Sequence, residues 1–532
     1  MDAFALYFIG WQIIDWQVLA MIFVGTTLGI IIGAMPGLSV IMAVSIIVPL
    51  TFRMDPVVSI LMLIGVYCGG NFGSAITACL INIPGTPSAI MTVMDGHPIS
   101  RRGKSGLAIG TATLASTIGG MFSVIVLALF SPALASVAVR FTSLEIFGVA
   151  LFGLSVIAYV SPGSTLKGIA VGLVGLLIAT IGFDPNTGIA RFTFGSINLF
   201  GGIDFVPAMI GLFGMAEMMQ VIEKTKQERE LTIVRDKVSR TWDAMKYLQK
   251  LKWVFLRSSI VGVFIGIIPG AGGTIAAIAG YGVQKKASRH SHLMGKGSLE
   301  GVAAPETSNS ACIGGGFVPL LSLGIPGDAV TAVIIGAFII HGIVPGPMLY
   351  TTNPQLVSAI FIGMMLANVF VFILGMTCAN QIAKILKIPA ALLNAMIIAL
   401  CVIGTFAVRN SLFDTGVMVV FGIVGYFMSK GGVPKAPLVL GLVLGPIVEE
   451  NLRRWAMLAD GDFGSAFMNA VLTNPVTLVM VLATVAIFVV PLFARKKHFS
   501  EEDAKKYAQA AADDDLDVNE IIFADRKKAA KD

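Results

Sequence analysis

The sequence is poor in charged residues. Of its 532 residues only 13% are Asp, Glu, Lys or Arg, whereas 56% are hydrophobic and the mean hydropathy is +0.85. A chain this apolar exposes more hydrophobic surface than one water-soluble core can bury. It is therefore predicted to be a polytopic membrane protein held in a lipid bilayer. The formal net charge of +6 is ordinary for basic cytoplasmic loops and does not indicate a nucleic-acid partner.

The sequence also lacks the patterns of disulfides, metal sites and catalytic centres. The cysteines lie in apolar stretches without CxxC or paired spacing, and His290 and His292 are too few for a zinc site. No HExxH or GxSxG motif is present. These absences predict no metal and no cofactor, and they argue against an enzyme.

Residues 1–35 contain no Lys or Arg, so they lack the charged region that opens a cleavable signal peptide. The first apolar run is expected to be a retained helix. A membrane-spanning helix needs about 20 apolar residues, and on that criterion the chain is predicted to have about 10 to 14 membrane segments.

Charge is concentrated in two stretches that interrupt the apolar sequence, and both are expected to be cytoplasmic. They divide the chain into five predicted parts: a first membrane repeat (1–222), a charged linker (223–252), a second membrane repeat (253–474), a final transmembrane helix (475–494) and a charged C-terminal tail (495–532).

The two halves of the chain share a pattern of Pro-Gly motifs. "GAMPGLSVIMA" (33–43) matches "GIIPGAGGTIA" (266–276), and further on "INIPGTPSAIM" (81–91) matches "LGIPGDAVTAV" (323–333). Arg and Lys follow the first IPG motif but not the second, and they precede the second matched region but not the first. Under the positive-inside rule the two repeats therefore have inverted topology.

Pro-Gly motifs in a membrane chain raise a physical question, because they interrupt helices and leave backbone groups that lipid cannot satisfy. Such breaks are tolerated where they line a cavity or pack in protein. The N-terminus of a half-helix offers free N–H groups and a partial positive charge to an anion. One break alone would favour a simple kink, but four in two matched pairs favour a binding site for an anion with two or more carboxylates.

Short polar side chains cluster beside these breaks, and they offer donors to carboxylates and oxygens to Na⁺. Helix packing is the alternative role for any one of them. The hydroxyl and amide groups expected to hold carboxylates, together with backbone N–H groups after Gly85 and Gly327, belong to Ser39, Thr86, Ser88, Asn309, Ser310 and Thr331, with Thr274 beside them. The groups expected to hold Na⁺ belong to Asn71, Asn82 and Asp328.

Carboxylates in apolar stretches are rarer and carry more information. Asp328 follows the second IPG motif, and Glu306 lies in "APETSNSA". Both are candidates for Na⁺ or H⁺ coupling, although either could instead cap a helix N-terminus. Asp95 is expected to be a loop or capping residue.

At this point the sequence resembles the large membrane subunit of tripartite tricarboxylate transporters, the TctA family. The resemblance rests on four long motifs in order, "GAMPGLSVIMAVSIIVPLTF", "GGNFGSAITACLINIPGTPSAIMTVMDGHPISRRGKSGLAIG", "GIIPGAGGTIAAIAGYGVQKKAS" and "LEGVAAPETSNSACIGGGFVPLLSLGIPGDAVTAVIIGAFIIHGIVPGP". It implies a bacterial inner-membrane transporter with a small membrane subunit and a periplasmic solute-binding protein that delivers a carboxylate such as citrate. It also implies uptake driven by a cation gradient, usually Na⁺.

The motifs of that family fall on residues of this chain. Its glycine–proline motifs carry over onto Pro36, Gly37, Pro84, Gly85, Pro269, Gly270, Pro326 and Gly327. The chain departs from some relatives at Thr86, which stands where they carry an acidic residue.

The sequence as a whole therefore predicts an all-α permease of two inverted repeats with interrupted helices and a cytoplasmic C-terminus. It would bind an organic di- or tricarboxylate between the repeats and move it inward with Na⁺, H⁺ being the other candidate ion, by an elevator-type motion. The alternatives are a passive anion channel and, with less support, a membrane enzyme.

Overall fold

The computed structural model describes most of the chain. The described residues are 10–35, 37–160, 165–184, 187–224, 240–385, 390–459, 462–473, 477–478 and 482. Pro36, the predicted tail and almost all of the predicted final helix lie outside them.

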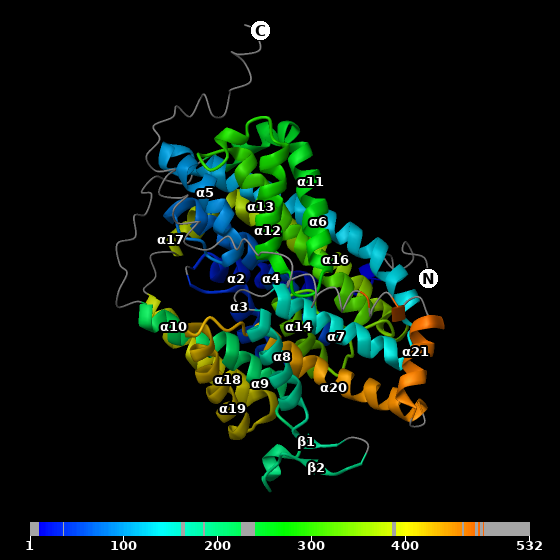
Figure 1. Cartoon of the computed structure of the whole chain (residues 1–532). Helices are drawn as coiled ribbons and strands as arrows, with labels where there is room; N and C mark the ends of the chain where they lie inside the picture. The colour runs from blue at the N-terminus through cyan, green and yellow to red at the C-terminus, as the bar shows by residue number, and fades with distance from the viewer. Residues whose placement is uncertain are drawn as a thin grey trace.

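The described chain is built from helices, with one short β-hairpin between α8 and α9 (Figure 1). Within the described ranges, six segments are long and apolar enough to cross a membrane: Trp16–Gly33, Pro56–Ile81, Pro87–Ala138, Phe205–Glu223, Pro354–Thr377 and Leu412–Lys430. The prediction of an all-α, multi-pass membrane protein is confirmed.

The described part of the first half holds nine α-helices and two π-helical segments of varied length, with short 3₁₀ turns and the hairpin between them. Its elements are α2 (Trp16–Gly33), α3 (Val40–Ile47), η1 (Val48–Thr51), α4 (Pro56–Ile81), η2 (Pro87–Ala89), α5 (Ile90–Ile99), η3 (Ser100–Lys104), α6 (Ser105–Ala138), α7 (Ser143–Val160), α8 (Thr165–Ala179), β1 (Gly182–Phe183), β2 (Ala190–Arg191), η4 (Ile197–Leu199), α9 (Phe205–Met209), η5 (Ile210–Met215) and α10 (Ala216–Lys224).

The described residues of the second half form helices joined by turns and loops, with no strand among them. Its elements are η6 (Thr241–Tyr247), α11 (Leu248–Ile267), α12 (Gly272–Ala287), η7 (Ser291–Leu293), α13 (Leu299–Leu323), α14 (Ala329–Ile340), α15 (Leu349–Thr352), α16 (Pro354–Thr377), α17 (Ala379–Ile385), α18 (Ala390–Arg409), α19 (Leu412–Lys430), α20 (Ala436–Leu458) and α21 (Phe463–Thr473). Helix α11 begins inside the predicted 223–252 linker, whose residues 225–239 lie outside the described part.

All four Pro-Gly motifs interrupt helices, in the same order in each half. The breaks fall between α2 and α3, between α4 and η2, between α11 and α12, and between α13 and α14. Gly37 and Gly270 have φ angles of +86° and +81°, which residues with a Cβ rarely adopt. Proline without a following glycine does not have this effect, since Pro305 and Pro319 both lie inside α13.

Close backbone packing holds each pair of helices that flanks a break. A Cβ atom added at Gly29 of α2 would lie 2.3 Å from the Val66 carbonyl oxygen of α4. In the second half, a Cβ atom at Gly262 of α11 would lie 2.3 Å from the Ser308 carbonyl oxygen of α13. Small residues thus let both pairs of helices approach at backbone distance, as in packed membrane helices.

The two halves also exchange packing partners. Helix α6 of the first half packs along α13 of the second, and α16 of the second half packs along α4 of the first. In the same way α5 contacts α13, while α14 contacts α3 and α4. Figure 1 shows the result, in which helices far apart in the sequence lie side by side at the centre of the molecule.

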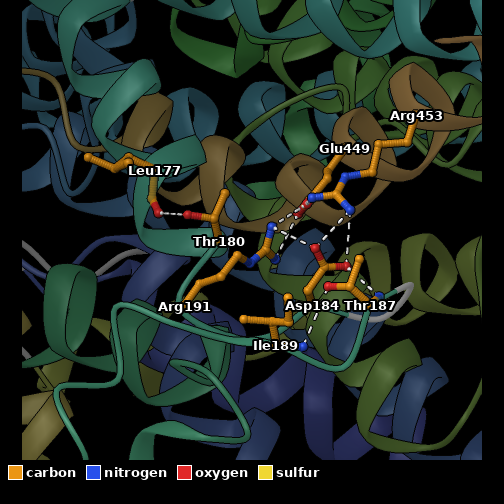
Figure 2. A network of polar contacts seen from close by, with 8 residues as sticks. All are labelled: Leu177, Thr180, Asp184, Thr187, Ile189, Arg191, Glu449 and Arg453. Atoms are coloured by element: carbon orange, nitrogen blue, oxygen red, sulfur yellow. Dashed lines mark hydrogen bonds and ion pairs between the residues drawn. The ribbon is translucent and has the colours of Figure 1, made fainter.

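The hairpin projects beyond the helices and is fixed to α20 by charged side chains (Figures 1 and 2). Arg453 donates to Asp184 at 2.8 Å, and Arg191 donates to Glu449 at 2.5 Å. Arg453 also contacts Glu449 at 2.8 Å. The hydrogen bond to Glu449 raises the pKa of Arg191 above its usual value. We call Asp184, Arg191, Glu449 and Arg453 the hairpin network.

Candidate functional site

The second and third helix breaks meet at the centre of the molecule. Ser88 lies in η2, just after the second break, and Gly273 lies in the first turn of α12, just after the third. A Cβ atom added at Gly273 would lie 2.2 Å from Asn309 Oδ1 and 3.7 Å from Ser88 Cβ. Ser88, Gly273 and Asn309 thus form a junction between the two halves, which we call the break junction.

Asn309 has the most informative environment in the break junction. Its side chain is fully buried (0% exposed), and neither Oδ1 nor Nδ2 has a hydrogen-bond partner in the described part of the chain. A buried amide without partners costs about 1–3 kcal/mol, so nearly all such groups in proteins are paired. Asn309 therefore presents one free acceptor and one free donor group beside the N-terminus of α12.

The loop of the second break supplies two hydroxyl groups, one of them from Ser88 of the break junction. Thr86 and Ser88 are both buried, and their hydroxyl oxygens lie 2.8 Å apart. Thr86 also begins η2, since its carbonyl oxygen accepts from the Ala89 N–H at 3.0 Å. The short polar residues predicted at the second break are thus grouped with the predicted Asn309 from the other half.

The fourth break is organised around Asp328. Its side chain caps α14 by accepting from the Thr331 N–H and hydroxyl, both at 2.8 Å, and the Asp328 N–H donates back to the Thr331 hydroxyl. Tyr67 of α4 donates its hydroxyl to the other carboxylate oxygen. Both oxygens of Asp328 therefore accept protein donors, which is the capping alternative foreseen from the sequence.

Backbone contacts join the third and fourth breaks. The Gly270 N–H donates to the Gly327 carbonyl oxygen at 2.6 Å. A Cβ atom at Gly327 would lie 2.3 Å from Gly316 Cα, and one at Gly85 would lie 2.3 Å from the Gly33 carbonyl oxygen. Gly85 and Gly327 therefore allow each break to pack directly on a neighbouring helix.

The remaining predicted residues are spread around the four breaks. Pro269, Ser310 and Pro326 are buried, Pro84 and Thr274 are half-buried, and Gly37 is exposed. Of the predicted Na⁺ ligands, Asn71 lies in the middle of α4 while Asn82 caps its C-terminus. Eleven residues of helix separate these two by about 16 Å, so the structure does not bring them together.

At the first break the structure reveals a carboxylate that the sequence analysis missed. Ser39 caps α3, and it also donates its N–H and hydroxyl to Glu217 of α10 at 3.3 and 2.8 Å. The Lys435 ammonium lies 5.8 Å from the centre of the Phe213 ring, and Phe213 is part of η5, the π-helical segment that precedes α10. In the sequence, Glu217 is an isolated carboxylate in the apolar run "FVPAMIGLFGMAEMMQ". This isolation is the feature by which the sequence could have marked it as a candidate.

Asp95 and Glu306 are two fully buried carboxylates that face different partners. Asp95 lies inside α5, not in a loop, and accepts from the backbone N–H groups of Gly295, Gly297 and Ser298 and from the Tyr281 hydroxyl. The expectation of a loop or local capping residue is therefore wrong, since Asp95 instead accepts from the distant segment that precedes α13. Glu306 has only hydroxyl partners.

Comparison with known proteins places this architecture in a family. A protein of Agrobacterium vitis, described as an uncharacterized 52.8 kDa protein in the TAR-I ttuC' 3' region, is 38% identical over 486 residues, which cover 90% of this chain and 95% of the relative. A second one, from the TAR-II ttuC' 3' region, is 37% identical over 242 residues, which cover 46% of this chain and all of the relative. No solved structure matches.

The family model described as the tripartite tricarboxylate transporter TctA family matches residues 19–440. This range contains all four helix breaks, the break junction and most of the helices on either side. The chain therefore belongs to the tripartite tricarboxylate transporter TctA family, as its motifs predicted, and is a membrane component of a transporter.

Proposed function

We propose that this permease binds an organic di- or tricarboxylate, such as citrate, at the break junction and carries it inward. The observation that carries the proposal is Asn309, whose buried amide has no hydrogen-bond partner among the residues that the structure describes. A carboxylate there would accept from Asn309 Nδ2 and from the hydroxyls of Thr86 and Ser88. The N-terminus of α12 favours negative charge at the same place.

The proposed transport cycle uses two inverted repeats, with the predicted boundaries at residues 222, 253 and 474. Each half has the same order of long helix, break, short helix, long helix, break and short helix, which supports this arrangement. The elements that carry the breaks contact one another across the halves. We expect them to move as one unit against the outer helices, which is an elevator-type motion.

The proposed setting is the bacterial inner membrane, with the C-terminus in the cytoplasm. A small membrane subunit and a periplasmic solute-binding protein would complete the transporter, as the family name, tripartite, suggests. If the basic loop at residues 97–105 is cytoplasmic, the succession of membrane segments places Arg191 and Arg453 outside, so the hairpin would face the periplasm. The segment that follows β2 carries the exposed Phe194 (91% exposed) and Ile197.

The test is uptake of labelled citrate and a panel of other carboxylates into liposomes. The vesicles would contain this chain and the small membrane subunit, with or without the binding protein and with or without an inward Na⁺ gradient. Concentrative uptake that needs the binding protein and the gradient is the expected result. Equilibration that needs neither would indicate a passive channel, and no uptake of any carboxylate would contradict the proposed function.

Na⁺ coupling is proposed to involve Asp328, and it needs its own test. In Asp328→Asn the amide replaces an oxygen that accepts from Tyr67 or Thr331. We expect a higher Na⁺ requirement and weaker cap stability. The matched control is Tyr67→Phe, which removes one donor to Asp328 and keeps the charge. If Asp328→Asn leaves both Na⁺ dependence and carboxylate affinity as in the parent, Asp328 has no role in coupling.

A further inference from the structure

Glu306 is a fully buried carboxylate (0% exposed) at the centre of α13. Its Oε1 accepts from the Thr92 hydroxyl of α5 at 2.5 Å, and its Oε2 accepts from the Ser116 hydroxyl of α6 at 3.4 Å. Within the described chain no Lys, Arg or His lies within 4.0 Å of it. Its contacts are therefore two neutral hydroxyls.

The elements packed around Glu306 also bring no compensating charge to it. Helix α6 contains no titratable side chain, and the Cys79 thiol of α4 is the titratable group that α4 turns toward Glu306. On α5, Asp95 is held by the segment before α13, and the His97 ring lies 3.3 Å from the Cys79 carbonyl oxygen.

The other neighbours of α13 direct their polar groups elsewhere. Tyr281 of α12 donates to Asp95, and Arg257 of α11 donates to the Trp253 carbonyl oxygen on its own helix. Glu300, one and a half turns earlier on α13, accepts from Gln284 at 2.7 Å. Asp328 at the start of α14 accepts from Tyr67 and Thr331.

A buried carboxylate without a cationic partner is stable chiefly in its neutral form, because burial penalises the charged one. In a membrane protein such a group is a candidate for ion or proton handling. Two neutral hydroxyls lower the penalty only partly. Glu306 therefore can hold a proton in this arrangement and release it when water or a cation reaches it.

Glu306 is coupled by position to the break junction. It lies three residues before Asn309 on the same face of α13, and Thr92 of α5 follows Ser88 of η2 by four residues. Both η2 and α5 contact α13, and Thr92 donates to Glu306. A ligand that shifts η2 relative to α13 changes the contacts of Glu306 as well.

We propose that Glu306 is a proton-binding site that couples H⁺ movement to carboxylate transport. In one state of the cycle its Oε carries the proton; in the other the O–H bond breaks and the proton passes to water on the opposite side. This inference rests on the proposed function, since it concerns the driving ion of the same site. It adds a proton to the Na⁺ already proposed.

The test compares Glu306→Gln with the parent in liposomes containing a pH-sensitive dye. For one proton per carboxylate, a gradient of one pH unit supports about tenfold extra accumulation. The parent should show it, together with carboxylate-dependent acidification of the lumen. Glu306→Gln should lose both while still exchanging internal for external carboxylate. Glu300→Gln, on the same helix, is the control and should behave as the parent.

A second variant keeps the test decisive if Glu306→Gln does not fold. Thr92→Val removes the hydroxyl that donates to the ionised carboxylate, so the protonated form gains, and the midpoint of pH-dependent uptake should move to higher pH. An unmoved midpoint would overturn the proposal, as would Glu306→Gln with full proton uptake. A parent that accumulates carboxylate on a Na⁺ gradient without any proton movement would overturn it and leave the proposed function standing.

Discussion

The hairpin network and the break junction are two polar regions with opposite designs. In the hairpin network both carboxylates contact guanidinium groups, and one side of the network is open to water. In the break junction Asn309 is fully buried and has no hydrogen-bond partner among the described residues, and the same holds for the neighbouring Thr307 hydroxyl. The first region uses its polar groups to fix a structure, whereas the polar groups of the second are the ones that we propose for carboxylate binding.

The two regions differ in how much free energy is needed to form them. Partly exposed ion pairs contribute little apiece but are inexpensive to form. Unpaired polar groups in a dry centre reduce stability, and they persist in proteins mainly where function requires them. The comparison makes a general claim: changes at the break junction should affect transport more than stability, and changes in the hairpin network should do the reverse.

The largest loss of transport and stability is expected from a steric clash at the fourth helix break. In Gly327→Ala the new Cβ would lie 2.3 Å from Gly316 Cα, so the fourth break has to move. We expect transport to be lost and stability to fall by about 1–3 kcal/mol. Thermal unfolding in detergent and uptake would measure this. Gly282→Ala is the control, because nothing lies within 4 Å of its added Cβ; loss of transport there would show that the assay does not report packing.

The next largest effect is expected on carboxylate affinity, from a change in the break junction. Asn309→Ala removes a side chain that has no hydrogen bond to lose, so we expect a roughly tenfold weaker carboxylate affinity, about 1.4 kcal/mol, with a small change in melting temperature. Ser308→Ala is the control on the same helix. Its hydroxyl donates to the Ser258 carbonyl oxygen at 2.8 Å, so it should lose stability and keep its affinity; the opposite pattern would refute the comparison.

A smaller effect is expected on stability, from a change in the hairpin network. Arg453→Ala removes the closest partner of the buried Asp184 and leaves Arg191 at 3.8 Å. We expect a loss of about 1–2 kcal/mol in stability, reduced by the exposure of the pair, and unchanged carboxylate affinity. Unfolding curves and binding would be measured together. A fall in affinity as large as that of Asn309→Ala would mean that the two regions are not separate.

The smallest effect comes from an exposed ion pair outside both regions. Lys430 donates to Glu223 at 2.8 Å, and both side chains are about half exposed. Such pairs are often neutral, so Lys430→Ala should leave both melting temperature and uptake unchanged. High salt should likewise have no effect on the parent through this pair. A clear loss of stability would show that exposed pairs matter more here than the comparison assumes.

The positions of the helix breaks could be predicted because they depend on local chemistry. The contacts between distant helices could not be predicted from the sequence. Pro-Gly motifs act through backbone geometry within a few residues, and the four matched motifs all lie between helices. The capping alternative for Asp328 is equally local. By contrast, the approach of Ser88 to Gly273, and of Ser39 to Glu217, depends on how helices from different parts of the chain pack. One sequence does not report that packing.

The same limit applies to charge. Asp184 and Arg453 lie 269 residues apart, and nothing in either neighbourhood of the sequence indicates their pairing. For Glu306 the sequence shows a carboxylate in an apolar stretch, but only the structure shows that its partners are hydroxyls. The separation of Asn71 and Asn82 could be predicted from the sequence, because eleven residues on one helix correspond to about three turns.

The most direct measurement is equilibrium binding of labelled carboxylates to the purified chain, with Asn309→Ala and Ser88→Ala beside the parent and Ser136→Ala as control. Ser136 is exposed, and its hydroxyl bonds only to the Ala133 carbonyl oxygen. The account predicts saturable binding of a di- or tricarboxylate, weakened about tenfold in each of the first two variants and unchanged in the control. Equal affinity in all four proteins would contradict a binding site at the break junction.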